Sequence, residues 1–438
     1  MNKLVSSLAV VAALAVFVGC SDNDALTEVQ NPQPIRFTVT IDNGDITRAQ
    51  RITKDNFTEY QVWATNGNTK RPWLHASTIE GMFDNNVWKE TSNTATWDNL
   101  TDKVNTNTFF ALSADGGNMT LANAGVTLTE LANNDNVDSN QEVAAEKYLD
   151  YSMPTTGSLI DLDKQVDIMA AYTSGIAKNA AVPLNFQHIL SNIEIKALVT
   201  DAMWNSDTHQ FDNVDDTQFP FDQDTWFYIR YIVIHGLKAE GQYKFSDGTW
   251  TTSGDAVDIK IPVDKFFYYH DLSVAANEFR AANGGTNAVV EEHRMEIEHS
   301  VYDDVVVGAN SIMVIPQQVT PWDYSVLPAT APTSNDCCIE VFGVACSAGD
   351  PITDQAAHEA VIRSYMLANG KWGGSYNTDL DNYGTLYWGN EYPDQKEDGQ
   401  ELSGYFKLST KFEAGKKYTI WLNLGRIRYD DGYLIESV

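Results

Sequence analysis

The chain has 438 residues, of which 43% are hydrophobic and 11% aromatic, enough apolar material for two or three packed domains. Its formal net charge is -31 and its isoelectric point is near 4.4. A protein this acidic repels phosphate backbones, so we expect no nucleic-acid partner. The charge suits an exposed surface protein.

The N-terminus has the features of an export signal. Lys3 precedes an uncharged stretch of about 15 residues, which is signal-peptide length and too short to span a bilayer. Gly19 and Cys20 follow, and they resemble the lipobox of bacterial lipoproteins, in which the cysteine is acylated, for example with palmitate. The alternative is a secretory signal with an incidental cysteine. We predict a lipoprotein signal peptide over residues 1–19 and lipidation of Cys20, with the protein anchored in the outer membrane at the cell surface.

Residues 20–34 form an acidic, polar tether. The segment Ser21–Asp24 resembles the export tag that moves some lipoproteins of Gram-negative anaerobes to the outer face, and a plain solvated tether is the alternative. Pro32 and Pro34 close this segment before the first apolar pattern begins.

The first predicted strand shows strict alternation. Its apolar residues are Ile35, Phe37, Val39 and Ile41, and each is followed by a polar residue. This period of two predicts a strand with one buried face.

The same alternation recurs along the chain, in the segments 182–186, 193–199, 257–263 and 418–424. Clusters of Gly, Asn, Asp and Ser between such segments supply turns. Helical periodicity is confined to residues 354–368 and, more weakly, 141–149. The fold class we predict is all-β, with two tandem β-sandwiches and short inserted helices.

Three further cysteines lie close together, at Cys337, Cys338 and Cys346, with no CxxC spacing. If the segment is one strand, Cys338 and Cys346 are about 26 Å apart, which is too far for a disulfide. We interpret the three as buried thiols, and we expect no zinc site.

Three segments approach catalytic or metal-binding motifs, but each departs from the motif. His358–Ile362 begins like the zinc motif HExxH, but Ile362 replaces the second histidine. Ala345–Gly349 resembles a nucleophile elbow, but Pro351 separates it from the next helix. Asp379–Gly384 lacks part of a calcium-loop ligand set. We therefore expect no enzyme activity, no metal and no cofactor.

Histidine and aromatic residues are further candidates for a functional site. His188 follows an apolar strand pattern, and we expect a hydrogen-bonded structural histidine there. Exposed aromatic rings could stack on sugars, although packing in the cores is the default for them. The aromatic residues in or near predicted loops are Trp73, Trp88, Trp97, Trp322, Trp372, Tyr387, Trp388 and Tyr392.

Five segments occur in an order that resembles the fimbrillin-like lipoproteins, the subunits of type V pili. They are NFTEYQVWA (56–64), VDIMAAYTSG (166–175), VPLNFQHILSNIEIKA (182–197), SIMVIPQ (311–317) and FEAGKKYTIWLNL (412–424). The resemblance implies two transthyretin-like β-sandwich domains, for which we set the bounds 35–178 and 179–438. It also implies export as a lipoprotein, trimming by a trypsin-like protease and polymerisation into an adhesive fimbria by donor strand exchange, with other pilus subunits or with itself.

The C-terminus departs from this pattern. Only 14 residues, GRIRYDDGYLIESV, follow Leu424, fewer than the terminal strands expected of a shaft subunit. A tip or accessory subunit is therefore as plausible as a shaft subunit.

Basic residues follow the first predicted strand. A cut by a trypsin-like protease after Arg48 or Arg51 would release the tether together with the first strand, and would open a groove for the strand of another subunit. The alternative is a plain loop whose arginines interact with solvent or nearby carboxylates. At the level of function, the alternative is a monomeric surface lipoprotein that binds a glycan or host ligand through exposed aromatic residues.

Overall fold

The fold is known from a computed structural model. It describes residues 33–41, 52–67, 72–97, 106–115, 126–129, 148–156, 159–199, 203–205, 210–212, 225–269, 295–296, 312–322, 335–347, 360, 385–386, 403–423 and 433–437.

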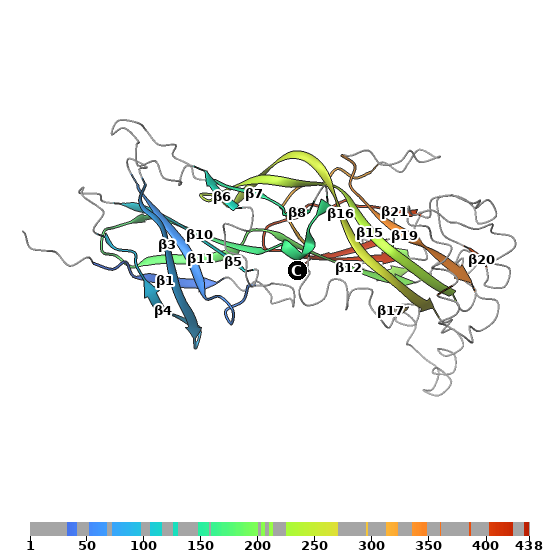
Figure 1. The fold of residues 1–438 in the computed structure, drawn as a ribbon, viewed down its shortest axis with the longest axis horizontal. Helices are drawn as coiled ribbons and strands as arrows, with labels where there is room; N and C mark the ends of the chain where they lie inside the picture. The colour runs from blue at the N-terminus through green and yellow to red at the C-terminus, as the bar shows by residue number, and fades with distance from the viewer. Residues whose placement is uncertain are drawn as a thin grey trace, which may run out of the picture.

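The N-terminal part of the chain forms a seven-stranded sheet (Figure 1). In spatial order its strands are β1 (Phe37–Ile41), β11 (Val182–His188), β10 (Asp167–Ile176), β5 (Asn107–Asp115), β2 (Glu59–Asn66), β3 (Pro72–Asp84) and β4 (Val87–Asn93). β1 and β11 are parallel, whereas all other neighbours are antiparallel. Asn85 and Asn86 connect β3 to β4 with positive φ angles of 51° and 63°, as a tight hairpin turn requires.

A second seven-stranded sheet is built on a long hairpin, β15 (Thr225–Lys244) and β16 (Thr249–Tyr269), which arches over the upper part of Figure 1. Its other strands are β20 (Thr385–Leu386), β19 (Cys338–Ser347), β21 (Ser403–Lys407), β7 (Tyr148–Ser152) and β6 (Val126–Thr129). The first half of β15 pairs with β19 and its last five residues pair with β7. One strand therefore joins segments from distant parts of the chain.

The remaining strands form smaller sheets. A five-stranded sheet contains β17 (Met295–Glu296), β12 (Ser191–Val199), β22 (Lys417–Asn423), β23 (Tyr433–Ser437) and β18 (Ile312–Val314). Two short hairpins are β8 (Thr155–Thr156) with β9 (Leu159–Ile160), and β13 (Met203–Asn205) with β14 (Gln210–Asp212). A 3-10 turn, η2 (Leu162–Lys164), follows β9.

Strand β5 of the N-terminal sheet is buried on both faces. Along β5, Phe109 and Ala111 belong to a core on one face, whereas Phe110 and Leu112 belong to the core on the other. The second core continues into the sheets of the C-terminal part, and the ring of Phe110 lies 5.4 Å from that of Phe245, directly after β15. The two parts of the molecule therefore share apolar contacts through β5.

The predicted all-β class is confirmed. The predicted strands at 35–41, 182–186, 193–199, 257–263 and 418–424 lie in or overlap β1, β11, β12, β16 and β22. Of the helix predicted over 354–368, the structure describes only Ala360, which is helical. The helix predicted over 141–149 is wrong at its end, because Tyr148 and Leu149 lie in β7; its other residues lie outside the described part.

The boundary placed between residues 178 and 179 stays a prediction. β11, directly after it, belongs to the N-terminal sheet, whereas β6 and β7, which precede it, pair into the sheet of β15.

Candidate functional site

The first strand buries one face and exposes the other, as its alternation predicts. The buried residues are Ile35, Phe37, Val39 and Ile41, each at most 8% exposed, and the exposed ones are Arg36, Thr38 and Thr40. Burial of a side chain of this size stabilises the folded chain by about 1.5–3 kcal/mol. The strand is therefore held to the molecule largely by these four side chains.

On one side β1 has a continuous strand partner, β11. The parallel register runs from Phe37 opposite Val182 to Ile41 opposite Phe186. The Val182 amide donates a 2.8 Å hydrogen bond to the Arg36 carbonyl, which starts the ladder. On this side β1 is a regular member of the sheet.

The other side of β1 is bound mainly near its start. The Ile35 amide donates to the Ala95 carbonyl over 3.0 Å, and the Trp97 amide donates to the Gln33 carbonyl over 2.9 Å. Within the described residues, the backbone hydrogen bonds on this side stop at Ile35. The next contact is made by a side chain, since the Phe37 amide donates to Oε1 of Glu90 over 3.3 Å.

These contacts let the first strand complete the curled sheet. It stands at one end of the strand order, beside β11, and also contacts the segment that follows β4; without β1, β11 and β4 would be the two ends of this order. β1 is therefore the piece whose removal would separate those two ends.

The buried face of β1 packs against aromatic rings. The ring of Phe37 meets those of Tyr60 and Phe109 edge-on, with centroids 6.0 Å and 6.2 Å away. Burial, together with the nearby Glu90 carboxylate, raises the pKa of the Tyr60 phenol far above its ordinary value. The phenol therefore stays neutral, and a strand that replaced β1 would pack on these aromatic rings.

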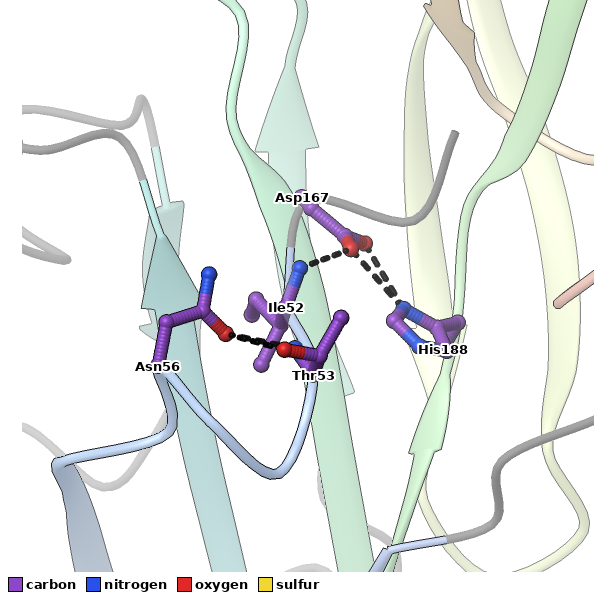
Figure 2. A network of polar contacts seen from close by, with 5 residues as sticks. All are labelled: Ile52, Thr53, Asn56, Asp167 and His188. Carbon is purple, nitrogen blue, oxygen red and sulfur yellow. Dashed lines mark hydrogen bonds and ion pairs between the residues drawn. The ribbon is translucent and has the colours of Figure 1, made fainter. Parts of the chain in front are cut away.

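The chain returns from the first strand at Ile52, where it is fixed by a buried carboxylate (Figure 2). The Ile52 amide nitrogen lies 3.2 Å from Oδ2 of Asp167, at the start of β10. Nδ1 of His188, at the end of β11, lies 3.0 Å from Oδ1 and 2.9 Å from Oδ2 of the same carboxylate. Asp167 is fully buried, so this contact joins three segments inside the protein.

A short turn continues from this contact. The Thr53 amide donates to Oδ1 of Asn56 over 2.6 Å (Figure 2). The Phe57 amide donates to the Thr53 carbonyl over 2.9 Å. Ile52 and Phe57 are each 1% exposed, so both ends of the turn are fixed in the core. The turn from Ile52 to Phe57 is therefore held by both its hydrogen bonds and its buried ends.

The predicted site residues divide into two groups. The four apolar residues of the first strand lie together on one buried face, as predicted. Cys20, Arg48 and Arg51 lie outside the described residues. Lipidation and proteolytic processing at these positions stay predictions.

The other candidates raised by the sequence are structural where they are described. His188 is hydrogen-bonded to a carboxylate, as expected of a structural histidine. Trp88, Trp97 and Trp322 are buried, and Trp73 is half-buried against the core. Trp372, Tyr387, Trp388 and Tyr392 lie outside the described residues. Those aromatic residues that the structure describes therefore offer little surface for a sugar ring.

Two of the cysteines match the interpretation as buried thiols. Cys337 and Cys338 are buried and unbonded, and Cys338 and Cys346 belong to the single strand β19. Burial raises the pKa of the Cys337 thiol to about 12.

Among the residues that the structure places, no three His, Cys, Asp or Glu side chains are grouped to hold a metal ion. No helix in the described ranges is both long and apolar enough to cross a membrane.

A second charged contact lies in the sheet of β15. Nδ1 of His235 lies 2.9 Å from Oδ1 of Asp258, and its Nε2 lies 2.9 Å from Oε2 of Glu340. Burial lowers the pKa of this imidazole, but its hydrogen bonds and attraction to the two carboxylates outweigh that effect and raise the pKa to about 9. The protonated ring therefore joins β15, β16 and β19.

The contact between Ile52 and Asp167 was not predicted from the sequence. Asp167 stands between the apolar residues Val166 and Ile168, and a lone carboxylate in an apolar run is the one signal that could have drawn attention to it. The Ile52 end is a backbone amide, which leaves no trace in the sequence.

No family model matches this chain, and no curated protein matches it. Solved structures with a similar arrangement include two candidate cell adhesion proteins, from Bacteroides ovatus and Bacteroides uniformis. The first is 11% identical, with 93% of this chain and 97% of that chain covered and a TM-score of 0.35. The second is 13% identical, with 92% and 96% covered and a TM-score of 0.35. A third, from Parabacteroides distasonis, is 7% identical, with 88% and 94% covered and a TM-score of 0.38.

Proposed function

We propose that this chain is a subunit of a surface fimbria of the type V pilus kind, which assembles by protease-triggered exchange of its first strand. The observation that carries the proposal is the position of β1. It buries four alternating apolar side chains and, among the described residues, has a continuous backbone ladder on one side only.

Removal of β1 would create an acceptor for another strand. It would free the backbone edge of β11 and expose apolar side chains beneath it, among them Phe109 and Tyr60. An extended segment with the same alternation could restore both the hydrogen bonds and the burial. The donor would come from another pilus subunit or from a second copy of this chain.

The proposal includes a lipid anchor at Cys20. Export as an outer-membrane lipoprotein would hold the subunit at the cell surface until a trypsin-like protease cuts after Arg48 or Arg51. That cut would release the anchor and β1 together, because both precede the cleavage site in the chain. Replacement of the acylated residue, Cys20→Ala, should abolish palmitate labelling, and labelling that persists would remove the anchor from the proposal.

The role that follows is association rather than turnover. The assembled fimbria would support cell adhesion, with a host surface or glycan as a further partner. In the structure the C-terminal β23 pairs with β22 of its own chain, from Tyr433 to Ser437. Electron microscopy with a label on this chain distinguishes a shaft subunit, labelled along the filament, from a tip or accessory subunit.

Limited trypsin digestion of the chain produced with Cys20→Ser tests the exchange. We expect new N-termini at Ala49 or Ile52, loss of the peptide that contains β1, and growth of oligomers. Mass spectrometry identifies the termini and the lost peptide, and sizing measures the oligomers. The matched control is the double variant Arg48→Gln and Arg51→Gln, which should stay monomeric. A cut chain that retains β1 and remains a monomer would refute the proposal.

A further inference from the structure

Asp167 is a buried carboxylate whose basic neighbour, among the described residues, is a histidine rather than a Lys or Arg. It is 0% exposed, and its described partners are the imidazole of His188 and the backbone amide of Ile52. No Lys or Arg among the described residues forms an ion pair with it. Because a buried carboxylate is costly unless it is paired and hydrogen-bonded, the site would gain from a cation at the position of the Ile52 nitrogen.

Ile52 directly follows Arg51, one of the two proposed cleavage positions. Hydrolysis of the Arg51–Ile52 peptide bond adds one water molecule. It leaves a carboxylate on Arg51 and an amine on Ile52, which is protonated near neutral pH. The atom that becomes the ammonium is the one that already lies 3.2 Å from Oδ2 of Asp167.

We propose that Asp167 and His188 form a receptor for the new N-terminal ammonium that cleavage after Arg51 creates at Ile52. This inference rests on the proposed function for the protease that makes the cut. The new ammonium has three donors and a full charge in place of one neutral N–H, so its contact with the carboxylate is stronger than the original hydrogen bond.

The surroundings keep the new terminus in place after the cut. The Ile52 side chain is buried, and the turn from Thr53 to Asn56 holds the following residues. Since the peptide bond before Ile52 lies beside a buried residue, cleavage there needs a local opening, after which the segment returns to Asp167. The segment that begins at Ile52 therefore stays bound to Asp167, while β1 is free to dissociate.

The receptor distinguishes the two cleavage positions. After a cut at Arg48, Ala49, Gln50 and Arg51 still precede Ile52, whose nitrogen remains a neutral amide. Only the cut after Arg51 places an ammonium group beside the buried carboxylate. The two products therefore differ in the state of Asp167, even though both lose β1.

The test places a site-specific cut directly before Ile52 in the full chain. Substitutions Arg48→Ile, Ala49→Glu and Gln50→Gly create the sequence Ile-Glu-Gly-Arg, after which factor Xa cleaves. The cut is made in mild urea, which admits the protease, and the urea is then removed. An acetylating reagent labels the exposed amines, and mass spectrometry follows the labelling rate of the Ile52 amine.

Two controls give the rate for an amine without the receptor. One is the same cut chain with Asp167→Asn, and the other is the Arg51→Gln chain cut by trypsin after Arg48, whose new amine is on Ala49. We expect the Ile52 amine to react at least about tenfold more slowly than either control, since each unit by which its pKa rises removes nine-tenths of the reactive form. If Asp167→Asn does not fold, the Ala49 control alone decides.

Equal labelling rates would overturn the receptor, and so would a chain that factor Xa cannot cut even in urea. Sizing of the same samples tests the proposed function separately. A protected Ile52 amine in a protein that stays monomeric would leave the receptor standing and refute strand exchange. Oligomers with a freely reactive Ile52 amine would do the reverse.

Discussion

The hydroxyl of Thr40 donates a 2.9 Å hydrogen bond to Oδ1 of Asn185, on the exposed face of the β1–β11 pair. The two residues stand opposite each other in the parallel register. Neighbouring strands lie about 4.8 Å apart, which is within the range of Cα separations that a disulfide spans. This pair therefore offers a reversible lock on the first strand.

The double variant Thr40→Cys and Asn185→Cys should be unable to release β1 when it is oxidised. After the trypsin cut we expect the β1 peptide to stay linked to the chain, with no oligomers, because the groove remains filled. Reduction of the same sample should restore release and oligomer growth. Sizing and non-reducing mass spectrometry measure both states, and oligomers that form equally well in the oxidised sample would refute strand exchange.

The substitution Phe37→Ala should weaken the attachment of β1. Phe37 is 8% exposed and packs edge-on against Tyr60 and Phe109. Loss of a buried phenylalanine typically lowers the free energy of unfolding by about 3–5 kcal/mol. The control Thr38→Ala removes an exposed side chain on the other face, whose hydroxyl donates a long, 3.5 Å hydrogen bond to the Val182 carbonyl, and should change that free energy by about 1 kcal/mol or less. Urea unfolding of the uncut chains measures both, and equal values would show that the buried face of β1 contributes little.

The His235 contact should make stability depend on pH. Its folded-state pKa of about 9 lies above the ordinary value of 6.5, so the stabilisation is fully present below pH 6.5 and is lost as the pH rises through about 9. Because Asp258 is half exposed, we expect a contribution of about 1–2 kcal/mol. The variant His235→Gln should lose less stability than the original chain between pH 6.5 and 9, as measured by urea unfolding at each pH. Parallel curves for the two proteins would contradict the assignment.

The thiols of Cys337 and Cys338 should be inert in the folded protein. Both are buried, and burial raises the pKa of each, that of Cys337 to about 12, so almost no thiolate is present near neutral pH. Iodoacetamide at pH 8 should leave both unmodified in the native chain and should modify both in urea, as peptide mass mapping can show. Modification of either cysteine in the native chain would mean that β19 opens readily.

The sequence predicts faces of strands better than it predicts their neighbours. The alternation in β1 and β11 fixes which side chains are buried, because a residue step of two returns to the same face. It does not show that Phe37 pairs with Val182, 145 residues later, because many strands share the same period. The pairing depends on the whole sheet.

A different limit applies to β5 and to Asp167. Phe109, Phe110, Ala111 and Leu112 form a continuous apolar run because both faces of β5 are buried, so the period of two is absent. The contact of Asp167 with Ile52 joins a side chain to a backbone amide 115 residues away. Patterns of residue type carry no information about such a contact.

The double burial of β5 has a consequence for how the molecule melts. Phe109 and Phe110 are neighbours in sequence, but they serve as walls of two different cores. Denaturant that disrupts one core also frees β5 on that face. Because β5 contributes side chains to the other core as well, the two cores cannot lose their packing independently. The two parts of the molecule should therefore unfold in one cooperative transition.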